Sequence, residues 1–373
     1  MIIFEGYMEV SNFLRFKPLI REIKMKAAVW HGREDIRVVE RELKPLKDHE
    51  ITIRVAWAGI CGSDLHEYAE GPVFIPTEKE DLLAGGIAPL TMGHEFSGIV
   101  EAVGSEVTDY KVGDRVSVNP TLTHGNRSEY DDIYDGFSFI GLHCDGGFAD
   151  FVNVPESAVY ALPEGLSLET AALIEPTAVA VQAVKESGMR FGDTVAVFGA
   201  GPIGLVTIAA AKAAGATKVI ALDLSESRLE MAKAIGATHV INSGKEDPVA
   251  AIRKIVPRGT DVTFEVAGVQ QTVEQSINAT KARGMVVIVS IFANPITWHP
   301  MQLINTGVKL TSSIAYSPSS FRETIALMGS GQLDVTSIIT KKITLDEIMT
   351  EGFETLVNDK SQAKILVTLS GEM

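Results

Sequence analysis

The sequence predicts an α/β fold in which a β-rich part is followed by a doubly wound, mostly parallel sheet. Two changes of pattern predict it. Up to about residue 175, short segments alternate polar and apolar residues, as half-buried strands do. After residue 193, short apolar runs alternate with helical stretches, as in parallel sheets covered on both faces. The length of 373 residues favours two domains over one.

The first part is expected to begin near Met25, which leaves residues 1–24 as an N-terminal extension of unknown purpose. Residues 50–58 alternate in the way a strand does, and three further segments between glycines repeat the pattern: 96–103, 115–118 and 148–154. A long helical pattern then covers 168–187, and Gly188 closes it.

The second part is expected to contain buried strands at 194–198, 219–222, 262–266 and 285–290. Helical stretches between them begin at Ile203, Ser225, Pro248 and Gln270. From about residue 317 a helix and a few strands follow, the last at 365–369. We expect this final segment to return to the first part of the fold.

Composition excludes several classes of protein. The net charge of -15 and the lack of a basic stripe argue against a nucleic-acid partner. No apolar run reaches the roughly 18 residues of a membrane span, and the N-terminus lacks a secretory layout. The chain has only two cysteines, which points to a reducing compartment, so we expect a cytoplasmic protein. A Cys61–Cys144 disulfide is the alternative, but it would remove a thiol from the metal motif described below.

A glycine-rich turn between a strand and a helix predicts a dinucleotide site. Gly199 permits the tight turn, Gly201 lets a pyrophosphate approach the backbone, and Gly204 allows the helix to pack on the strand. Pro202 and Ile203 open the helix, whose N-terminus would face the phosphates.

Asp223 ends the next predicted strand, where a carboxylate can accept hydrogen bonds from an adenosine ribose. A 2′-phosphate would meet repulsion there, so NAD is favoured over NADP. Arg228 is a complication, because a nearby guanidinium could tolerate a phosphate; a solvated helix residue or an adenine-stacking group is the alternative.

Two motifs, at 59–66 and 93–98, contain residues that suit zinc. Cys61, His94 and a carboxylate from Glu95 or Glu175 can fill three tetrahedral positions and leave the fourth for water or an alcohol oxygen. Taken singly, the cysteine would be a small buried residue and Glu175 an ordinary helix residue. Only their joint occurrence indicates a metal site.

Over residues 25–373 the chain resembles the zinc-dependent medium-chain alcohol and polyol dehydrogenases. The resemblance rests on four features that occur in the same order as in that family: the two metal motifs, Glu175-Pro176 and the glycine turn. The stretches 61–68, 71–76 and 92–95 are most similar to the 2,3-butanediol dehydrogenases. The resemblance implies a GroES-like catalytic domain over 25–175 and 317–373, and a Rossmann NAD-binding domain over 176–316.

The resemblance also implies residue roles. Cys61 and His94 would bind a catalytic zinc. Glu175 takes the place of a second cysteine in many relatives, and Glu95 is a second carboxylate candidate; which of the two binds at rest is open. The zinc would act as a Lewis acid on the substrate hydroxyl, and hydride would pass to the nicotinamide.

Three further residues are given roles by the family pattern. Ser63 would accept the substrate proton, and His66 would pass it to solvent through the cofactor ribose. Asp64 resembles the carboxylate that orients the histidine ligand. Taken singly, His66 would be a surface histidine.

One segment departs from the family. Many relatives hold a structural zinc with four closely spaced cysteines, whereas residues 119–144 contain only Cys144. We therefore expect one catalytic zinc per chain and no structural zinc. This segment also contains four side chains that could bind another ion: His124, Asp131, Asp132 and Asp135. We expect them to be hydrogen-bonded loop residues, and a second ion site is the alternative.

The expected activity is NAD-dependent interconversion of a small secondary alcohol or vicinal diol and its ketone, 2,3-butanediol and acetoin first. Sorbitol (L-iditol) dehydrogenase and L-threonine 3-dehydrogenase are the alternative enzymes. The non-enzymatic alternative is a catalytically dead NAD-binding protein with a structural or sensor role. Tyr68 and Phe74 are expected near the substrate. A homodimer or homotetramer is the family-level expectation, with 285–290 and 308–314 as candidate pairing strands.

Overall fold

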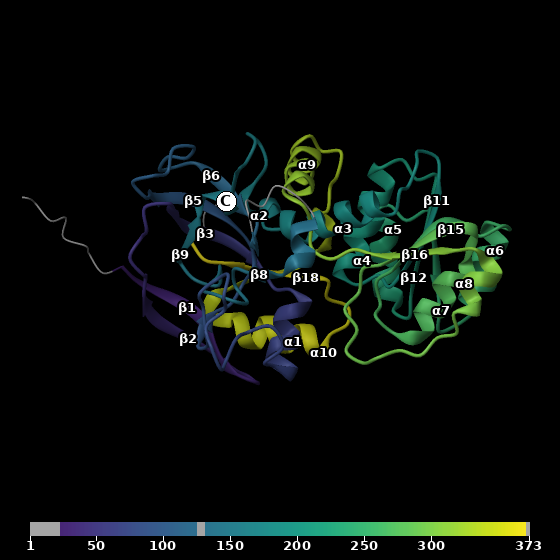
Figure 1. Cartoon of the computed structure of the whole chain (residues 1–373), viewed down its shortest axis with the longest axis horizontal. Coiled ribbons are helices and arrows are strands. Elements are labelled where there is room, and N and C mark those ends of the chain that lie inside the picture. Colours follow the sequence, from purple (N-terminus) through teal and green to yellow (C-terminus); the bar gives the residue numbers. More distant parts are fainter. Residues whose placement is uncertain (1–22, 125–130, 371–373) are drawn as a thin grey trace, which may run out of the picture.

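The computed structural model describes residues 23–124 and 131–370, so all but the last two residues of the predicted N-terminal extension lie outside it. The molecule is elongated and has two halves (Figure 1). One half is rich in β-strands, and the other contains a six-stranded sheet with helices packed around it. The predicted fold class is confirmed.

The β-rich half is built on a seven-stranded sheet. Six of its strands are hydrogen-bonded in the order β10 (Val159–Ala161), β6 (Arg115–Val118), β5 (Glu95–Val103), β3 (Glu50–Gly59), β18 (Lys364–Thr368) and β17 (Ile339–Thr344). The seventh, β9 (Phe151–Pro155), pairs with β3. A smaller sheet contains β2 (Asp35–Glu42), β1 (Lys24–Gly32) and β4 (Leu90–Thr91). Alternating apolar residues of these strands, such as Ile51, Ile53 and Val55, are fully buried between the layers.

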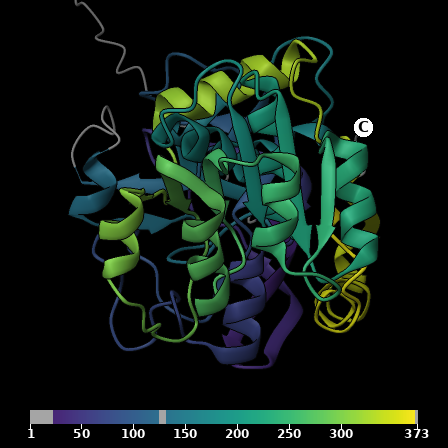
Figure 2. The same ribbon diagram turned by 90° about the vertical axis from the view of Figure 1, so that its right-hand side faces the viewer.

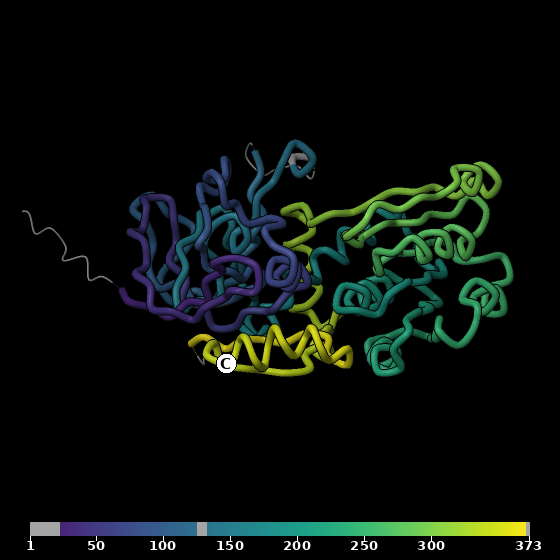
Figure 3. Tube along the Cα trace, turned by 90° about the horizontal axis from the view of Figure 1, so that it is seen from below, coloured from purple at the N-terminus to yellow at the C-terminus, as the bar shows by residue number. Residues whose placement is uncertain are grey.

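The C-terminal segment returns to this half. β18 pairs antiparallel with β3, so that Leu366 faces Gly59. Figure 3 shows the yellow C-terminal segment running beneath the β-rich half, with the green half beside it. The last strand of the chain therefore lies directly beside the segment that leads into the first metal motif.

The second half has one parallel sheet in the order β13-β12-β11-β14-β15-β16. Its strands are β11 (Thr194–Phe198), β12 (Lys218–Asp223), β13 (His239–Asn242), β14 (Thr260–Glu265), β15 (Thr280–Ile288) and β16 (Lys309–Ser312). Figure 2 views this half end-on, with helices packed around the strands. The order is that of a doubly wound dinucleotide-binding sheet, which places the nucleotide crevice at the carboxyl end of β11.

Helices follow the strands in turn. They are α4 (Pro202–Ala213), α5 (Glu226–Ile235), α6 (Pro248–Ile255), α7 (Gln270–Ala279) and α8 (Met301–Thr306). The predicted starts of α4, α5, α6 and α7 agree with the structure to within a residue, and Ser225 and Asp247 cap α5 and α6 with their side chains. α8 was not predicted. Within residues 23–124 and 131–370, no helix is both long and apolar enough to span a membrane.

The helix predicted over 168–187 is two helices, α2 (Leu168–Ala171) and α3 (Ile174–Glu186). The break has a physical reason: Pro176 lacks a backbone N–H, and a first helical turn is where that loss is harmless. A new helix therefore starts at Ile174. α3 packs against α4 and α9 (Pro318–Gly329) where the two halves meet (Figure 1).

The elements that sequence reasoning missed include α1 (Gly62–Glu70) and the strand β13. It also started the strand at 148 too early, since β9 begins at Phe151. α1 is the omission that matters for function, because it carries the first metal motif.

Candidate metal and nucleotide sites

The first metal motif lies where β3 gives way to α1. Cys61 is the residue before the helix, in an extended conformation, and its backbone N–H donates to Asp64 Oδ2 at 2.9 Å. A carboxylate at this position satisfies one of the free N–H groups of a helix start. The turn fixes the Cys61 side chain at the N-terminus of α1.

The second metal motif opens β5. Gly93 has φ +97°, and a side chain there would approach the Phe148 backbone nitrogen to 2.7 Å, so only glycine fits. The turn delivers His94 and Glu95, which are 4% and 0% exposed, into the interior.

These two turns bring three candidate ligands together. The Cys61 thiol, a ring nitrogen of His94 and a carboxylate oxygen of Glu95 all lie within 4.8 Å of one another. Cys61 is only partly buried, so the group borders a solvent-accessible space. A soft thiolate with an imidazole and a carboxylate is a donor set that suits zinc.

Unpaired polar atoms in the same place also fit a metal. The buried His94 Nδ1 and Asp64 Oδ1 have no hydrogen-bond partner although they lie 3.5 Å apart. Burial acts to lower the pKa of His94, but the negative charges of Asp64 and Cys61 outweigh it and raise that pKa well above its usual value. A cation is therefore favoured here, and binding of a metal would displace a proton.

Glu175 approaches from α3 but has a different partner. It is 5% exposed, and its Oε1 accepts a hydrogen bond of 2.7 Å from the Tyr316 hydroxyl. Burial raises its pKa to about 7, with Glu95 adding to the rise while His94, Tyr316 and the Lys364 ammonium oppose it. Glu175 is not among the atoms that lie within 4.8 Å of one another. Its role as a ligand stays a prediction.

Lys364 completes the buried group, and sequence reasoning missed it. It is 1% exposed and donates to Glu95 Oε1 and Oε2, both at 2.7 Å, and to the Ile60 carbonyl at 3.1 Å. Burial lowers its pKa, but the negative charges of Glu95 and Cys61 outweigh that effect and the pKa is raised. A lysine at the start of a mostly apolar C-terminal strand was the available signal, since buried lysines need a charged partner.

The two residues of the predicted proton relay both lie on α1. Ser63 Oγ is 3.2 Å from His94 Nε2. The His66 side chain is 43% exposed, and its Nδ1 lies 3.8 Å from Glu70 Oε2. Ser63 therefore lies beside the metal cluster, and His66 faces solvent. Their roles stay predictions.

Of the two predicted wall residues, Tyr68 lies on α1 and Phe74 lies in the loop that follows it. Tyr68 packs edge-on against Phe353, with ring centroids 5.5 Å apart, and Phe74 lies 6.5 Å from His143. Phe139, which sequence reasoning did not single out, lies beside the metal cluster: its ring centroid is 6.2 Å from that of His94.

The glycine turn has the shape that a pyrophosphate requires. Gly199 has φ +103°, and a side chain on Gly204 would approach the Gly199 carbonyl oxygen to 1.9 Å. Next to Gly201 the space is open, so a phosphate could approach the backbone there. Pro202 and Ile203 open α4, and its N-terminus faces this space.

Asp223 ends β12 beside this turn. Its Oδ2 accepts a hydrogen bond from the Ala200 N–H at 2.8 Å, and its Oδ1 accepts one from the Ser225 N–H at 2.9 Å. The carboxylate is thus held next to the phosphate-binding turn. Arg228 Nε donates to the Lys360 carbonyl at 3.1 Å.

In the part of the chain that the structure describes, the cluster of Cys61, His94 and Glu95 is the one group with the spacing of a metal site. The alternative second ion site includes Asp131 and Asp132, whose side chains lie outside the described residues. Both cysteines are free, and burial, the largest contribution, raises the pKa of the Cys144 thiol to about 12.

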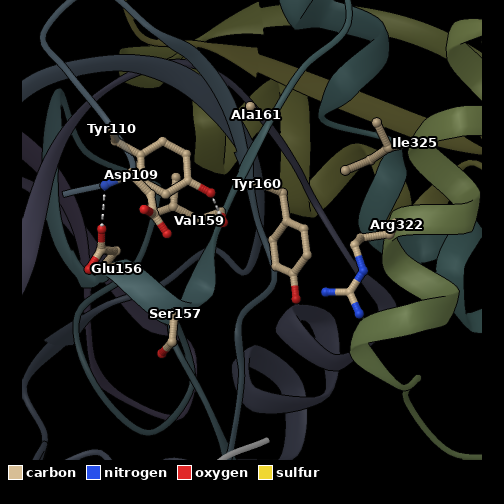
Figure 4. A pocket seen from close by; sticks show the side chains of 9 residues that line it. All are labelled: Asp109, Tyr110, Glu156, Ser157, Val159, Tyr160, Ala161, Arg322 and Ile325. Carbon is tan, nitrogen blue, oxygen red and sulfur yellow. Dashed lines mark hydrogen bonds between the residues drawn. The ribbon is translucent and has the colours of Figure 1, made fainter. Parts of the chain in front are cut away.

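A separate groove of about 520 Å³ lies between β10 and α9 (Figure 4). Tyr160 and Arg322 stand at one side of it, and Tyr110 and Glu156 at the other. Burial raises the pKa of Tyr110 to about 12, so its hydroxyl stays a neutral donor to the Val159 carbonyl. None of the predicted site residues lines this groove.

Comparison with known proteins identifies the family of the chain. Residues 47–164 match the alcohol dehydrogenase GroES-like domain, and residues 202–330 match the zinc-binding dehydrogenase domain. The (R,R)-butanediol dehydrogenase of Bacillus subtilis is 45% identical over 92% of this chain and 99% of its own. The crystal structure of 2R,3R-butanediol dehydrogenase from that organism superposes with a TM-score of 0.89 at 43% identity, covering 92% of this chain and 99% of its own.

Two further relatives show the breadth of the group. Sorbitol dehydrogenase of Bacillus subtilis is 33% identical over 87% of this chain and 91% of its own. A dehydrogenase structure from Sinorhizobium meliloti, bound to NADP, is 30% identical with a TM-score of 0.83, covering 93% of this chain and all of its own. With a matching model for each half and a relative above 30% identity along nearly its whole length, the chain belongs to the zinc-dependent alcohol dehydrogenase family, whose members use zinc and a nicotinamide cofactor.

Proposed function

We propose that this protein transfers hydride between NAD and a small secondary alcohol or vicinal diol, with 2,3-butanediol and acetoin as the substrate pair. The observation that carries the proposal is the partly accessible cluster of Cys61, His94 and Glu95 within 4.8 Å. The 45% identity to a butanediol dehydrogenase supports this choice of substrate within the family.

Cys61 and His94 would hold the zinc together with a carboxylate from Glu95 or Glu175. When bound, zinc supplies a Lewis acid that favours loss of the substrate hydroxyl proton near neutral pH. One such ion per chain is proposed, because residues 119–144 contain a single cysteine and a closed structural site needs four ligands.

The residues of α1 would remove the proton. Ser63 Oγ, 3.2 Å from His94 Nε2, stands beside the cluster and would accept it. His66 lies on the same helix with a 43% exposed side chain and would pass it to solvent. A helix brings residues i and i+3 to one face, which supports this direction of transfer.

NAD is proposed over NADP because Asp223 is fixed beside the glycine turn by the N–H groups of Ala200 and Ser225. Its charge would repel a 2′-phosphate, while its oxygens can accept bonds from ribose hydroxyls. Arg228 donates to the Lys360 carbonyl, which engages the guanidinium that could otherwise balance a phosphate.

A homodimer or homotetramer and a cytoplasmic location complete the proposal. β16 stands at one end of the six-stranded order, so its outer edge could pair across a two-fold axis. The free thiols of Cys61 and Cys144 suit a reducing compartment. Analytical ultracentrifugation of the full chain tests the subunit number.

A substrate panel tests the function directly. We expect kcat/KM for the 2,3-butanediol stereoisomers with NAD to exceed that for sorbitol and L-threonine, and chelation followed by zinc addition to abolish and restore the activity. Sorbitol leading by a large factor would move the protein to the polyol branch. A zinc-loaded protein that binds NAD but turns over none of these alcohols would support the non-enzymatic alternative.

A further inference from the structure

The buried pair of Lys364 and Glu95 joins the end of the chain to the metal cluster. The Lys364 ammonium lies 2.7 Å from each oxygen of the Glu95 carboxylate, and the two side chains are 1% and 0% exposed. The same ammonium donates to the Ile60 carbonyl, in the peptide bond that leads into Cys61. One cation therefore contacts the backbone before one candidate ligand and the side chain of another.

The surrounding backbone leaves this pair little freedom. The Ile60 N–H donates to the Ile365 carbonyl at 3.1 Å, and Leu366 faces Gly59 across the two strands. A side chain on Gly59 would approach Glu95 Oε2 to 2.2 Å, so β3 packs directly against the carboxylate. Both charged side chains are therefore enclosed where β3 pairs with β5 and β18.

The charges around the cluster explain why a lysine is buried here. Asp64, Glu95 and Glu175 are buried carboxylic acids in or beside the cluster, and Cys61 adds a thiol. An isolated buried carboxylate is strongly disfavoured, and a cation beside it removes most of that cost. Without a metal ion, the ammonium is the cation that balances Glu95.

We propose that Lys364 is a positioning residue that shares the Glu95 carboxylate with the zinc ion and thereby limits how strongly Glu95 holds the metal. The inference rests on the zinc centre proposed above. Both Glu95 oxygens face the ammonium, and one of them also lies within 4.8 Å of the Cys61 and His94 donor atoms. A carboxylate that already donates electron density to an ammonium donates less to a metal, so the zinc stays more electrophilic toward the alcohol.

The alternative is an ion pair that only stabilises the fold. The two interpretations differ in one respect: whether loss of the ammonium changes the interaction between protein and metal. If the cations share Glu95, removing Lys364 leaves zinc as the partner of a buried carboxylate, and zinc must bind more tightly. If the pair is structural only, the folded protein is destabilised equally with and without zinc.

The experiment compares zinc release and thermal stability in the full-length protein and in Lys364→Met. We expect Lys364→Met to release zinc to a chelator about tenfold more slowly than the natural sequence. This change has the size, but the opposite sign, of the smallest losses of metal affinity seen when a residue that contacts a metal ligand is replaced. The zinc-dependent rise in Tm should be larger in the variant, and kcat should fall. Lys364→Arg, which keeps the cation, should restore the natural release rate.

A neighbouring lysine provides the matched control. Lys342 on β17 pairs with Glu169 at 2.6 Å, and its side chain is 50% exposed, so Lys342→Met should leave zinc release unchanged. If Lys364→Met does not fold, Lys364→Gln is the second variant, since its amide can donate to Glu95 but brings no charge. It should slow zinc release in the same direction.

The outcomes separate the two proposals. Zinc release from Lys364→Met and Lys364→Gln that is as fast as, or faster than, release from the natural sequence overturns the shared-carboxylate inference and leaves the zinc centre intact. Absence of zinc from the natural protein after loading overturns the proposed zinc centre itself, and this inference with it.

Discussion

Cys61 owes its position to two local features, the end of β3 and the capped start of α1. Its backbone N–H bonds Asp64 Oδ2, and its side chain meets His94 and Glu95, which begin a different strand. The sequence motifs identified these residues because each motif is short and its turn geometry is local. Their meeting required the pairing of β3 with β5, which places Gly59 opposite Glu95.

Replacement of Cys61 tests the metal cluster at the level of one atom. Cys61→Ser replaces the thiol with a hydroxyl, a far poorer zinc ligand, so zinc per chain should fall to a small fraction and NAD reduction should be abolished. Elemental analysis and absorbance of the reduced nicotinamide measure the two effects. Cys144→Ser is the control, because Cys144 lies outside the cluster. This variant should keep its zinc content and its NAD-reducing activity.

Replacement of Asp223 tests the choice of cofactor. Asp223→Asn removes the charge that would repel a 2′-phosphate and would weaken hydrogen bonds to an adenosine ribose. We expect the preference for NAD over NADP, as a ratio of kcat/KM values, to narrow by about 10- to 100-fold, which corresponds to roughly 1.4–3 kcal/mol. Asp247→Asn, which alters the cap of α6, should leave the ratio unchanged. An unaltered ratio in Asp223→Asn would argue against the ribose contact.

Residue types also explain which participants were missed. Lys364 and Tyr316 are bonded to Glu95 and Glu175 over long sequence separations. Neither lies in a motif whose spacing carries chemistry. A buried lysine or tyrosine is recognisable only when its partner is known, because burial of a polar group depends on the bond it makes.

At the scale of elements, Asp145 joins the small sheet to the chain beyond it. Its Oδ1 accepts from Arg41 of β2 and from the Thr91 N–H of β4, both at 2.9 Å, and its Oδ2 lies 2.7 Å from the Lys44 ammonium. Burial acts to raise the pKa of this carboxyl, but the hydrogen bonds from Lys44 and Thr91 and the nearby positive charges outweigh it, so the pKa is lowered from its ordinary value of 3.8.

The lowered pKa gives a prediction with a definite sign. Asp145 stabilises the fold at pH values above 3.8, and that contribution is lost as the pH falls through the lower folded-state value. Asp145→Asn should therefore reduce the free energy of unfolding by about 1–3 kcal/mol at neutral pH, and the difference should shrink below about pH 4. Urea unfolding at several pH values measures it.

An exposed carboxylate is the control for that experiment. Asp346 pairs with Lys26, and their side chains are 62% and 53% exposed. Asp346→Asn should leave the free energy of unfolding nearly unchanged at each of these pH values, as expected for an exposed ion pair. If the difference in free energy of unfolding between the natural protein and Asp145→Asn increased at low pH, the role given to the Asp145 charge would be contradicted.

Elements were predicted well where a single local signal decided them. In the second half, Gly199 forms the turn before α4 and Asp247 caps α6. These two helices start where such residues predict. α1 was missed because its cap is formed by Cys61 and Asp64, whereas a capping box is usually sought as serine or threonine with glutamate or glutamine. The division into α2 and α3 was missed because Pro176 was taken as interior, although it opens a new helix.

At the scale of the molecule, the metal cluster draws on distant parts of the chain. Cys61 precedes α1 and Glu95 opens β5, while the buried Glu175 and Lys364 come from α3 and β18. A ligand that binds only the folded arrangement stabilises it by mass action. Zinc should therefore stabilise the β-rich half as a whole.

Removal of zinc tests this coupling. We expect chelation to lower the Tm of the natural protein by several degrees, since an ion present at 100 to 1,000 times its Kd adds about 3–4 kcal/mol. Differential scanning calorimetry with and without chelator measures the change. Cys61→Ser should show almost no response to the chelator. An equal response in both proteins would place the stabilising ion elsewhere.

The sequence by itself determined the donor types, the glycine turn and the alternation of strand and helix, because these depend on local spacing and on residue chemistry. The family assignment followed from them and is confirmed by the comparisons. Tertiary structure alone decided that β18 lies beside β3, that Lys364 faces Glu95 and that Tyr316 bonds Glu175. The physical reason is that such long-range pairs arise from the packing of whole sheets and helices, which no local pattern encodes.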